Sequence, residues 1–166
     1  MQEVSVIIPN YNGMAYLEGV LSTLEQQTFQ NFETILVDNG SSDGSVAFVM
    51  GNYPWVHIIE LADNYGFSRA VNEGIYAARA PYVLLLNNDT EVDKNFVGEM
   101  LASIKLHKKA FSCSARMIRY HERDKLDDAG NYYCALGWSF ARGKGKDIRT
   151  YEREERIFTS CAGAAI

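Results

Sequence analysis

The first hundred residues alternate short apolar runs with longer segments of helical periodicity, and no other feature of the chain constrains its fold as strongly. Residues 4–8 form a β-branched apolar run that stops at Pro9, which is typical of a buried strand bounded by a turn. Further strands are predicted over residues 34–37, 56–61 and 82–86. Helices are predicted between and after them, over residues 14–27, 45–52, 67–79 and 93–107.

Strands and helices that alternate at this length predict an α/β fold, with a largely parallel sheet covered by helices on both faces. On the helix over residues 67–79, the side chains expected to pack together are Ala70, Val71, Ile75 and Ala78. From residue 111 the pattern is less regular. We expect a strand over residues 111–118, and loops with short strands over residues 120–150.

Polar clusters follow three of the four predicted strands. They are Pro-Asn-Tyr-Asn at residues 9–12, Asp-Asn-Gly-Ser-Ser-Asp at residues 38–43 and Asn-Asn-Asp at residues 87–89. Ligands of parallel α/β sheets bind beyond the carboxyl ends of the strands. Three such clusters along one edge therefore predict a ligand-binding edge.

Two carboxylates in these clusters each keep two interpretations. Asp89 is either a ligand of a hard divalent cation or a cap of the helix over residues 93–107, for which Thr90 and Asp93 compete. Asp43 is either part of a ligand-binding loop or a cap at the start of the helix that follows it.

Asp38 and Arg69 suit the two ends of a nucleotide-like ligand. Asp38 ends the second predicted strand, where a carboxylate can hydrogen-bond a ribose or a base edge. Arg69 opens a predicted helix, so it could reach a phosphate together with the helix N-terminus.

Composition places the chain among soluble globular domains, because 47% of its 166 residues are apolar and 22% are charged. Charge is uneven: residues 1–100 hold 13 acidic and 3 basic side chains, whereas residues 101–166 hold 8 acidic and 13 basic ones. The basic portion either favours an anionic partner, such as a membrane surface or a phosphate-bearing acceptor, or is a solvated mixed-charge face. The overall net charge of −5 argues against nucleic-acid binding.

No localisation signal is evident in the sequence. The N-terminus is acidic where a signal peptide needs positive charge, and no apolar run approaches the roughly 20 residues of a membrane helix. Cys113, Cys134 and Cys161 are odd in number and widely spaced, which favours reduced thiols in a cytoplasmic protein.

Other nucleotide-binding classes lack their signatures here. A dehydrogenase needs Gly-x-Gly-x-x-Gly after its first strand, and a nucleoside triphosphatase needs Gly-x-x-x-x-Gly-Lys-Ser/Thr; neither occurs. A phosphate-accepting receiver domain needs an acidic cluster after the first strand, where this chain has Asn-Tyr-Asn.

Four phrases resemble family 2 glycosyltransferases of the GT-A fold, a Rossmann-like fold. They are Val-Ser-Val-Ile-Ile-Pro-Asn-Tyr-Asn-Gly at 4–13, Ile-Leu-Val-Asp-Asn-Gly-Ser-Ser-Asp-Gly-Ser at 35–45, Asn-Tyr-Gly-Phe-Ser-Arg-Ala-Val-Asn-Glu-Gly at 64–74 and Leu-Leu-Leu-Asn-Asn-Asp-Thr-Glu-Val at 84–92. They follow the order and spacing of the family. The Asn-Asn-Asp version is most similar to a rhamnosyltransferase-like branch that builds bacterial polysaccharides.

The resemblance implies a role for each matching position. Asp89 occupies the metal position of the family's Asp-x-Asp motif and implies a divalent cation, Mg or Mn. Asn87 replaces the first Asp of that motif. The implied contacts to a nucleotide-diphosphate sugar donor are Pro9, Tyr11, Asn12, Asp38, Asn39, Asp43, Asn64, Gly66, Phe67, Arg69, Asn72 and Asn87.

The implied activity is inverting, metal-assisted transfer of a hexosyl-type sugar to a saccharide or lipid-linked saccharide acceptor, at the inner face of a membrane. Residues 1–107 would be the nucleotide-sugar-binding half of one glycosyltransferase domain, and residues 108–166 the start of its acceptor-side half. The apolar ending suggests a fragment, with the family's general base beyond Ile166; the pair Asp127 and Asp128 resembles a family loop instead. The alternative is a nucleotide-sugar-binding module without catalytic activity.

Overall fold

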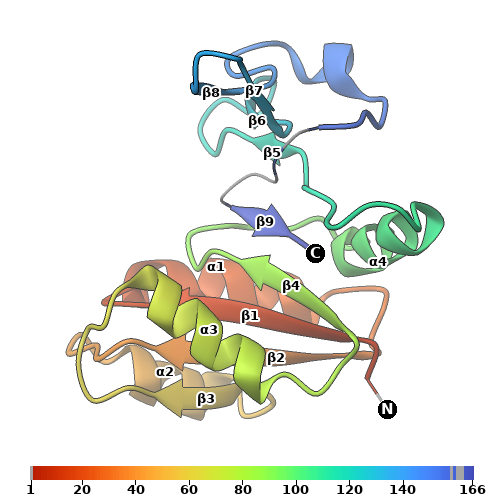
Figure 1. Cartoon of the computed structure of the whole chain (residues 1–166). Helices are drawn as coiled ribbons and strands as arrows, with labels where there is room; N and C mark the ends of the chain where they lie inside the picture. Colours follow the sequence, from red (N-terminus) through yellow and green to blue (C-terminus); the bar gives the residue numbers. More distant parts are fainter. Residues whose placement is uncertain (1, 158, 160–162) are drawn as a thin grey trace.

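The computed structural model describes residues 2–157, 159 and 163–166, and its centre is a five-stranded sheet (Figure 1). The strand order is β3-β2-β1-β4-β9. Four strands are mutually parallel, and the short β9 is antiparallel to β4. The strands are β1 (Val4–Asn10), β2 (Phe32–Asp38), β3 (His57–Glu60), β4 (Tyr82–Leu86) and β9 (Ala164–Ala165).

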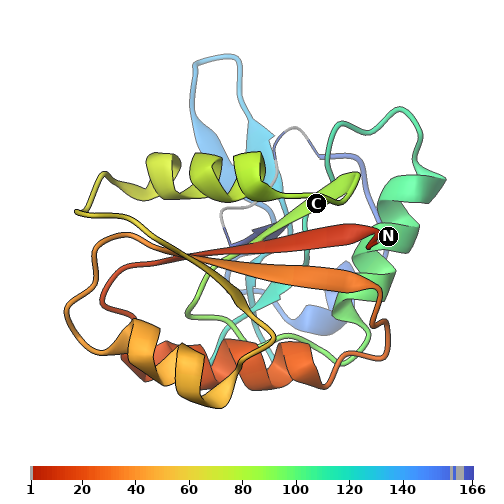
Figure 2. The same ribbon diagram turned by 90° about the horizontal axis from the view of Figure 1, so that it is seen from below.

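Helices cover both faces of the sheet, which confirms the predicted α/β fold (Figure 2). The helices are α1 (Met14–Glu25), α2 (Ser45–Asn52), α3 (Phe67–Ala77) and α4 (Phe96–Leu106). Helices α1, α2 and α4 share the larger core with the strands, whereas α3 covers the opposite face. This division follows from the strand period of two, because Val6 and Ile8 face α1 while Ile7 faces α3.

Helix α3 lies very close to the sheet at Gly74. A Cβ on Gly74 would fall 3.1 Å from Val37 Cγ2 and closer still to Ile7 Cγ2. The helix therefore packs through Ala70, Val71 and Gly74, and the prediction that Ile75 is packed is wrong: Ile75 is 40% exposed. Each helical residue is rotated about 100° from the last, so Ile75 turns away when Gly74 meets the sheet.

The second portion of the chain consists of short elements above β9 (Figure 1). They are β5 (Met117–Ile118), β6 (Leu126–Asp128), β7 (Asn131–Tyr133), β8 (Ser139–Ala141) and the 3₁₀ helix η1 (Ile148–Tyr151). The expected strand over residues 111–118 is regular only at β5. Upstream of it, the backbones of Cys113 and Ala115 hydrogen-bond Ile166 and Ala164, so this segment lines the free side of β9.

Cysteine and membrane-span findings concern the described part of the chain only. Cys113 and Cys134 are free thiols there, and Cys161 lies outside the described residues. Among those residues, no helix has the length and apolar character needed to cross a bilayer.

Candidate functional site

Asn10 joins the carboxyl ends of three strands. It is buried at the end of β1, and its Nδ2 donates to Asp38 Oδ1 at the end of β2 (2.9 Å). Its Oδ1 accepts from Asn88 Nδ2, just after β4 (2.7 Å). Two of the polar clusters noted in the sequence are thus tied to the first by one amide side chain.

The loop after β2 is folded around two further side chains. Asp38 is buried, and its Oδ2 accepts from the backbone N–H of Ser41 (2.9 Å). Asn12 Oδ1 accepts from the backbone N–H of Ser42, while the Asn12 N–H donates to Ser41 Oγ. Gly40 has a φ of 78°, which a side chain would strain. Asp38 and Asn12 therefore hold the loop that forms one wall of the site.

Asp43 clasps the first turns of two helices. Its Oδ2 accepts from the Met14 N–H of α1 (2.9 Å), and its Oδ1 accepts from the N–H and hydroxyl of Ser45 at the start of α2. Partial burial works to raise the pKa of Asp43, but the hydrogen bonds from Ser45 and Met14 outweigh it, and the pKa lies below its usual range. The geometry thus favours the capping interpretation of this carboxylate.

A pair of amides shapes the entrance to α3. Asn39 Nδ2 donates to Asn64 Oδ1 (2.8 Å), and Asn39 Oδ1 accepts from the Tyr65 N–H (3.0 Å). Asn64 Oδ1 also accepts from the Gly66 N–H (2.9 Å). Within the described chain, no side chain caps the N-terminus of α3, whose N-cap is Gly66. Backbone N–H groups of its first turn therefore stay available.

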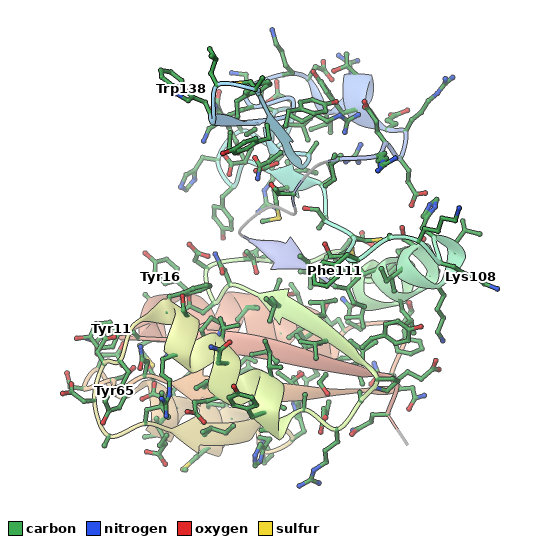
Figure 3. The ribbon with its side chains drawn as sticks, in the orientation of Figure 1. Tyr11, Tyr16, Tyr65, Lys108, Phe111 and Trp138 are labelled. Carbon is green, nitrogen blue, oxygen red and sulfur yellow. The ribbon has the colours of Figure 1, made fainter. Side chains whose placement is uncertain are left out.

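These groups enclose a hollow of about 420 Å³, called here the first hollow. Figure 3 shows Tyr11 and Tyr65 at this end of the sheet. Eight residues predicted from the sequence line it: Pro9, Tyr11, Asn39, Asn64, Gly66, Phe67, Asn87 and Asp89. Asn10, Ala70 and Asn88 complete the lining and were not singled out from the sequence, although Asn10 and Asn88 stand inside the polar clusters.

Five predicted residues do not line the first hollow. Asn12, Asp38 and Asp43 act on the loop and the helix ends instead. Arg69 pairs with Glu73 along α3 (Nε–Oε1 2.6 Å) and is exposed, and Asn72 is exposed one residue before Glu73. Sequence spacing gave their position on α3 but not the direction in which each side chain leaves the helix.

Asp89 is an exposed carboxylate with no hydrogen bond or ion pair to any residue that the structure describes. It does not cap α4, because that helix begins at Phe96 with Asn95 as its N-cap. Instead Gln27, at the end of α1, accepts from the Val97 N–H in the first turn of α4 (2.9 Å). Asp89 is therefore left free to meet a ligand.

The donor atoms near Asp89 fit a shared cation better than a fully caged one. Asn87 and Asn88 flank it with neutral amide groups, and the described residues contain no group of three His, Cys, Asp or Glu side chains that could hold a metal. Mg²⁺ commonly keeps waters and uses one or two carboxylates together with substrate phosphates. Such an ion is compatible with these residues.

A second hollow of about 620 Å³ shares Asp89 with the first. It is lined by α1, by the loop after β4 and by residues between β5 and β6. The lining residues are Ala15, Tyr16, Glu18, Gly19, Asp89, Thr90, Glu91, Tyr120 and His121. The pair Asp127 and Asp128 lines neither hollow, although burial raises the pKa of Asp128.

The sheet, its helices and its polar carboxyl edge define a GT-A glycosyltransferase fold, as do the solved structures described below. The chain belongs to glycosyl transferase family 2, whose family model matches residues 5–165. The family resemblance and the fold class predicted from the sequence are both confirmed.

Two relatives and one solved structure illustrate the match. Glycosyltransferase GlyG of Streptococcus pneumoniae is 31% identical over 134 residues, covering 78% of this chain and 42% of GlyG. The putative teichuronic acid biosynthesis glycosyltransferase TuaG of Bacillus subtilis is 28% identical over 75% of this chain and 50% of its own length. S. aureus TarS in complex with UDP is 26% identical, with a TM-score of 0.64 over 70% of this chain and 36% of TarS 1-349. The chain thus spans half or less of the length of these relatives.

Proposed function

We propose that the first hollow binds a nucleotide-diphosphate sugar, the donor of a glycosyl transfer. The observation that carries this proposal is the convergence of Tyr11, Asn39, Asn64 and Phe67 with Asp89 around one hollow at the carboxyl edge of the sheet. TarS, which shares the fold at 26% identity, was crystallised with UDP and with UDP-GlcNAc, and this supports the same ligand class here.

The lining offers a suitable group to each part of such a donor. Tyr11 is 50% exposed and Phe67 59% exposed, so both present ring faces on which a base or sugar can stack. The mutually oriented amides of Asn39 and Asn64 offer donors and acceptors to polar edges. The uncapped N-terminus of α3 suits the diphosphate, because free N–H groups and the helix dipole attract anions.

A divalent cation, Mg or Mn, is part of the proposal, held by Asp89 with help from Asn87. When bound, such an ion neutralises charge that grows on a leaving nucleoside diphosphate. Asp89 suits this role because its carboxylate is exposed at the rim of both hollows and has no competing partner among the described residues.

The proposed reaction is an inverting hexosyl-type transfer in bacterial polysaccharide biosynthesis. An acceptor hydroxyl oxygen bonds to the anomeric carbon while the carbon–oxygen bond to the diphosphate breaks. The electron pair leaves with the diphosphate, and the hydroxyl proton passes to a general base. Neither Asp127 nor Asp128 lines a hollow, so we propose that the base is a carboxylate outside residues 1–166.

Calorimetric titration of the chain with UDP, dTDP and their sugars, with and without manganese, tests the donor site. We expect saturable binding of at least one nucleotide that tightens with manganese and loses that gain in Asp89→Asn. Glu99→Gln removes a comparable exposed charge from α4 and should bind like the wild type. Binding that is equally strong in Asp89→Asn would refute the metal role, and no binding at all would refute the donor site.

We also propose a cytoplasmic location and a saccharide or lipid-linked saccharide acceptor. Attraction of residues 101–166 to an anionic membrane surface is a further hypothesis, and it is opposed by ion pairs. Seven basic side chains of this portion pair with acidic ones, among them Arg142 with Glu155 and Arg149 with Asp147. Failure to co-sediment with anionic liposomes at low salt would remove the hypothesis.

A further inference from the structure

The second hollow has the chemistry of a carbohydrate site. Tyr16 of α1 is 56% exposed and presents an aromatic face, and Tyr120 lines the same space. Glu18, Asp89 and Glu91 place carboxylates around these rings. Aromatic faces stack on the apolar faces of sugar rings, and carboxylates accept hydrogen bonds from sugar hydroxyls.

The wall contributed by the second portion of the chain is fixed to the loop after β4. Tyr120 Oη donates to Glu91 Oε1 (2.8 Å), and Arg123 Nη2 donates to Glu91 Oε2 (3.1 Å). The Arg123 guanidinium also lies over the Tyr120 ring, 4.7 Å from its centroid. Tyr120 is therefore held two residues from Asp89 along the β4–α4 loop, and the second hollow is built from both portions of the chain.

Charge decides which saccharides this hollow accepts. Its lining carries three carboxylates and His121 but no lysine or arginine. Arg123 neutralises Glu91 from outside the lining, which leaves Glu18 and Asp89 as negative charges facing the space. A phosphate group placed here would meet like charges without a cation to balance them.

We infer that the second hollow binds the sugar acceptor and selects an uncharged saccharide over a phosphorylated one. The inference deepens the proposed function and rests on it, because it takes the first hollow as the donor site. The shared residue supports the assignment: Asp89 borders both hollows, so a saccharide in the second lies directly across that carboxylate from a donor in the first. The basic residues 101–166 then do not serve a phosphate-bearing acceptor at this position.

Amide NMR titrations of the ¹⁵N-labelled chain test the inference. The probes are glucose and N-acetylglucosamine, each against its 6-phosphate. We expect the uncharged sugars to shift the amides of Gly19, Thr90 and His121, and the 6-phosphates to bind about fivefold more weakly or worse because of like-charge repulsion. Shifts confined to other parts of the chain, or 6-phosphates that bind equally well, would overturn the inference.

Variants separate the second hollow from general surface stickiness. Tyr16→Ala should weaken sugar binding by about three- to tenfold, since it removes the stacking face. Tyr76→Ala, an exposed tyrosine on α3 outside both hollows, is the matched control and should bind like the wild type. Glu18→Lys should improve binding of the 6-phosphates. Sugar binding that is unchanged in Tyr16→Ala would count against the site.

UDP added to the same samples reports on the first hollow through the amides of Asn39, Asn64 and Phe67. Loss of the UDP shifts alone would contradict the proposed donor site. UDP shifts without any sugar shift in the second hollow would leave the donor site standing and overturn the inference about the acceptor.

Discussion

Two glycines inside helices are subject to opposite packing constraints. Gly74 of α3 is buried directly against Ile7 of β1, a β-branched side chain that has little freedom to move aside. Gly19 of α1 meets only Glu91, whose Cγ would lie 3.5 Å from an added Cβ, an ordinary contact distance. The same residue type thus has a packing reason at one helix and none at the other.

This contrast predicts opposite effects of one substitution. Gly19→Ala should raise the free energy of unfolding by about 0.5–1 kcal/mol, because alanine loses less backbone entropy in a helix. Gly74→Ala should lower it by about 1–3 kcal/mol, because the methyl group overpacks the interface of α3 with the sheet. Urea denaturation of both variants provides the comparison. A stable Gly74→Ala would mean that α3 lies further from the sheet than the structure places it.

At the scale of elements, the starts of three helices depend on side chains distant in the sequence. Asp43 accepts from Met14 at the start of α1 as well as from Ser45 of α2, and Gln27 accepts from Val97 of α4. Sequence reasoning considered Thr90, Asp93 and Asp89 as caps of the last helix, because capping signals are sought next to a helix. A partner 70 residues away gives no such local signal.

Removal of the Asp43 clasp should destabilise the fold in a pH-dependent way. Asp43→Ala should cost about 1–2 kcal/mol near neutral pH, because two helix N-termini lose a hydrogen-bond acceptor. The folded-state pKa of Asp43 lies below its ordinary value of 3.8, so its contribution is full above that value and is lost as the pH falls through the folded pKa. The stability gap between wild type and variant should therefore narrow below about pH 4.

Urea denaturation from about pH 6 to about pH 3 measures this gap. Asp124→Ala is the matched control, because the Asp124 side chain makes no hydrogen bond in the described part of the chain. A gap for Asp43→Ala that stays constant through this range would show that the carboxylate charge does not contribute.

For the whole molecule, the arrangement predicts donor binding without full-rate transfer by these 166 residues. Glu91 is a poor candidate for the general base, since hydrogen bonds from Tyr120 and Arg123 hold its pKa below the usual range. Asp127 and Asp128 lie on and near β6, outside both hollows. Release of UDP and formation of a glycosylated product, measured with manganese and a saccharide present, should stay near background. Full-rate transfer would contradict the proposed location of the base.

The sequence predicted the first hundred residues well because their signals are local. Strand β4 and helix α2 match their predicted bounds, and Leu17, Val20 and Leu21 of α1 are buried as expected from their spacing. The short strands after residue 107 carry few apolar residues each, so their pairing depends on contacts with β9 and with one another. Their positions could not be obtained from periodicity.

The site was predicted in composition but not in the division of labour among its residues. Four sequence phrases in the order of the family determined that the carboxyl edge carries the polar groups, because strand-end loops of a parallel sheet must meet there. Tertiary structure decided which groups face a ligand. Asn10 finds its partners 28 and 78 residues away, and those bonds commit Asn10 and Asp38 to holding the edge together, whereas Asp89 stays exposed. A local pattern can place a side chain at a strand end, but only the folded chain supplies the partners that occupy it or leave it free.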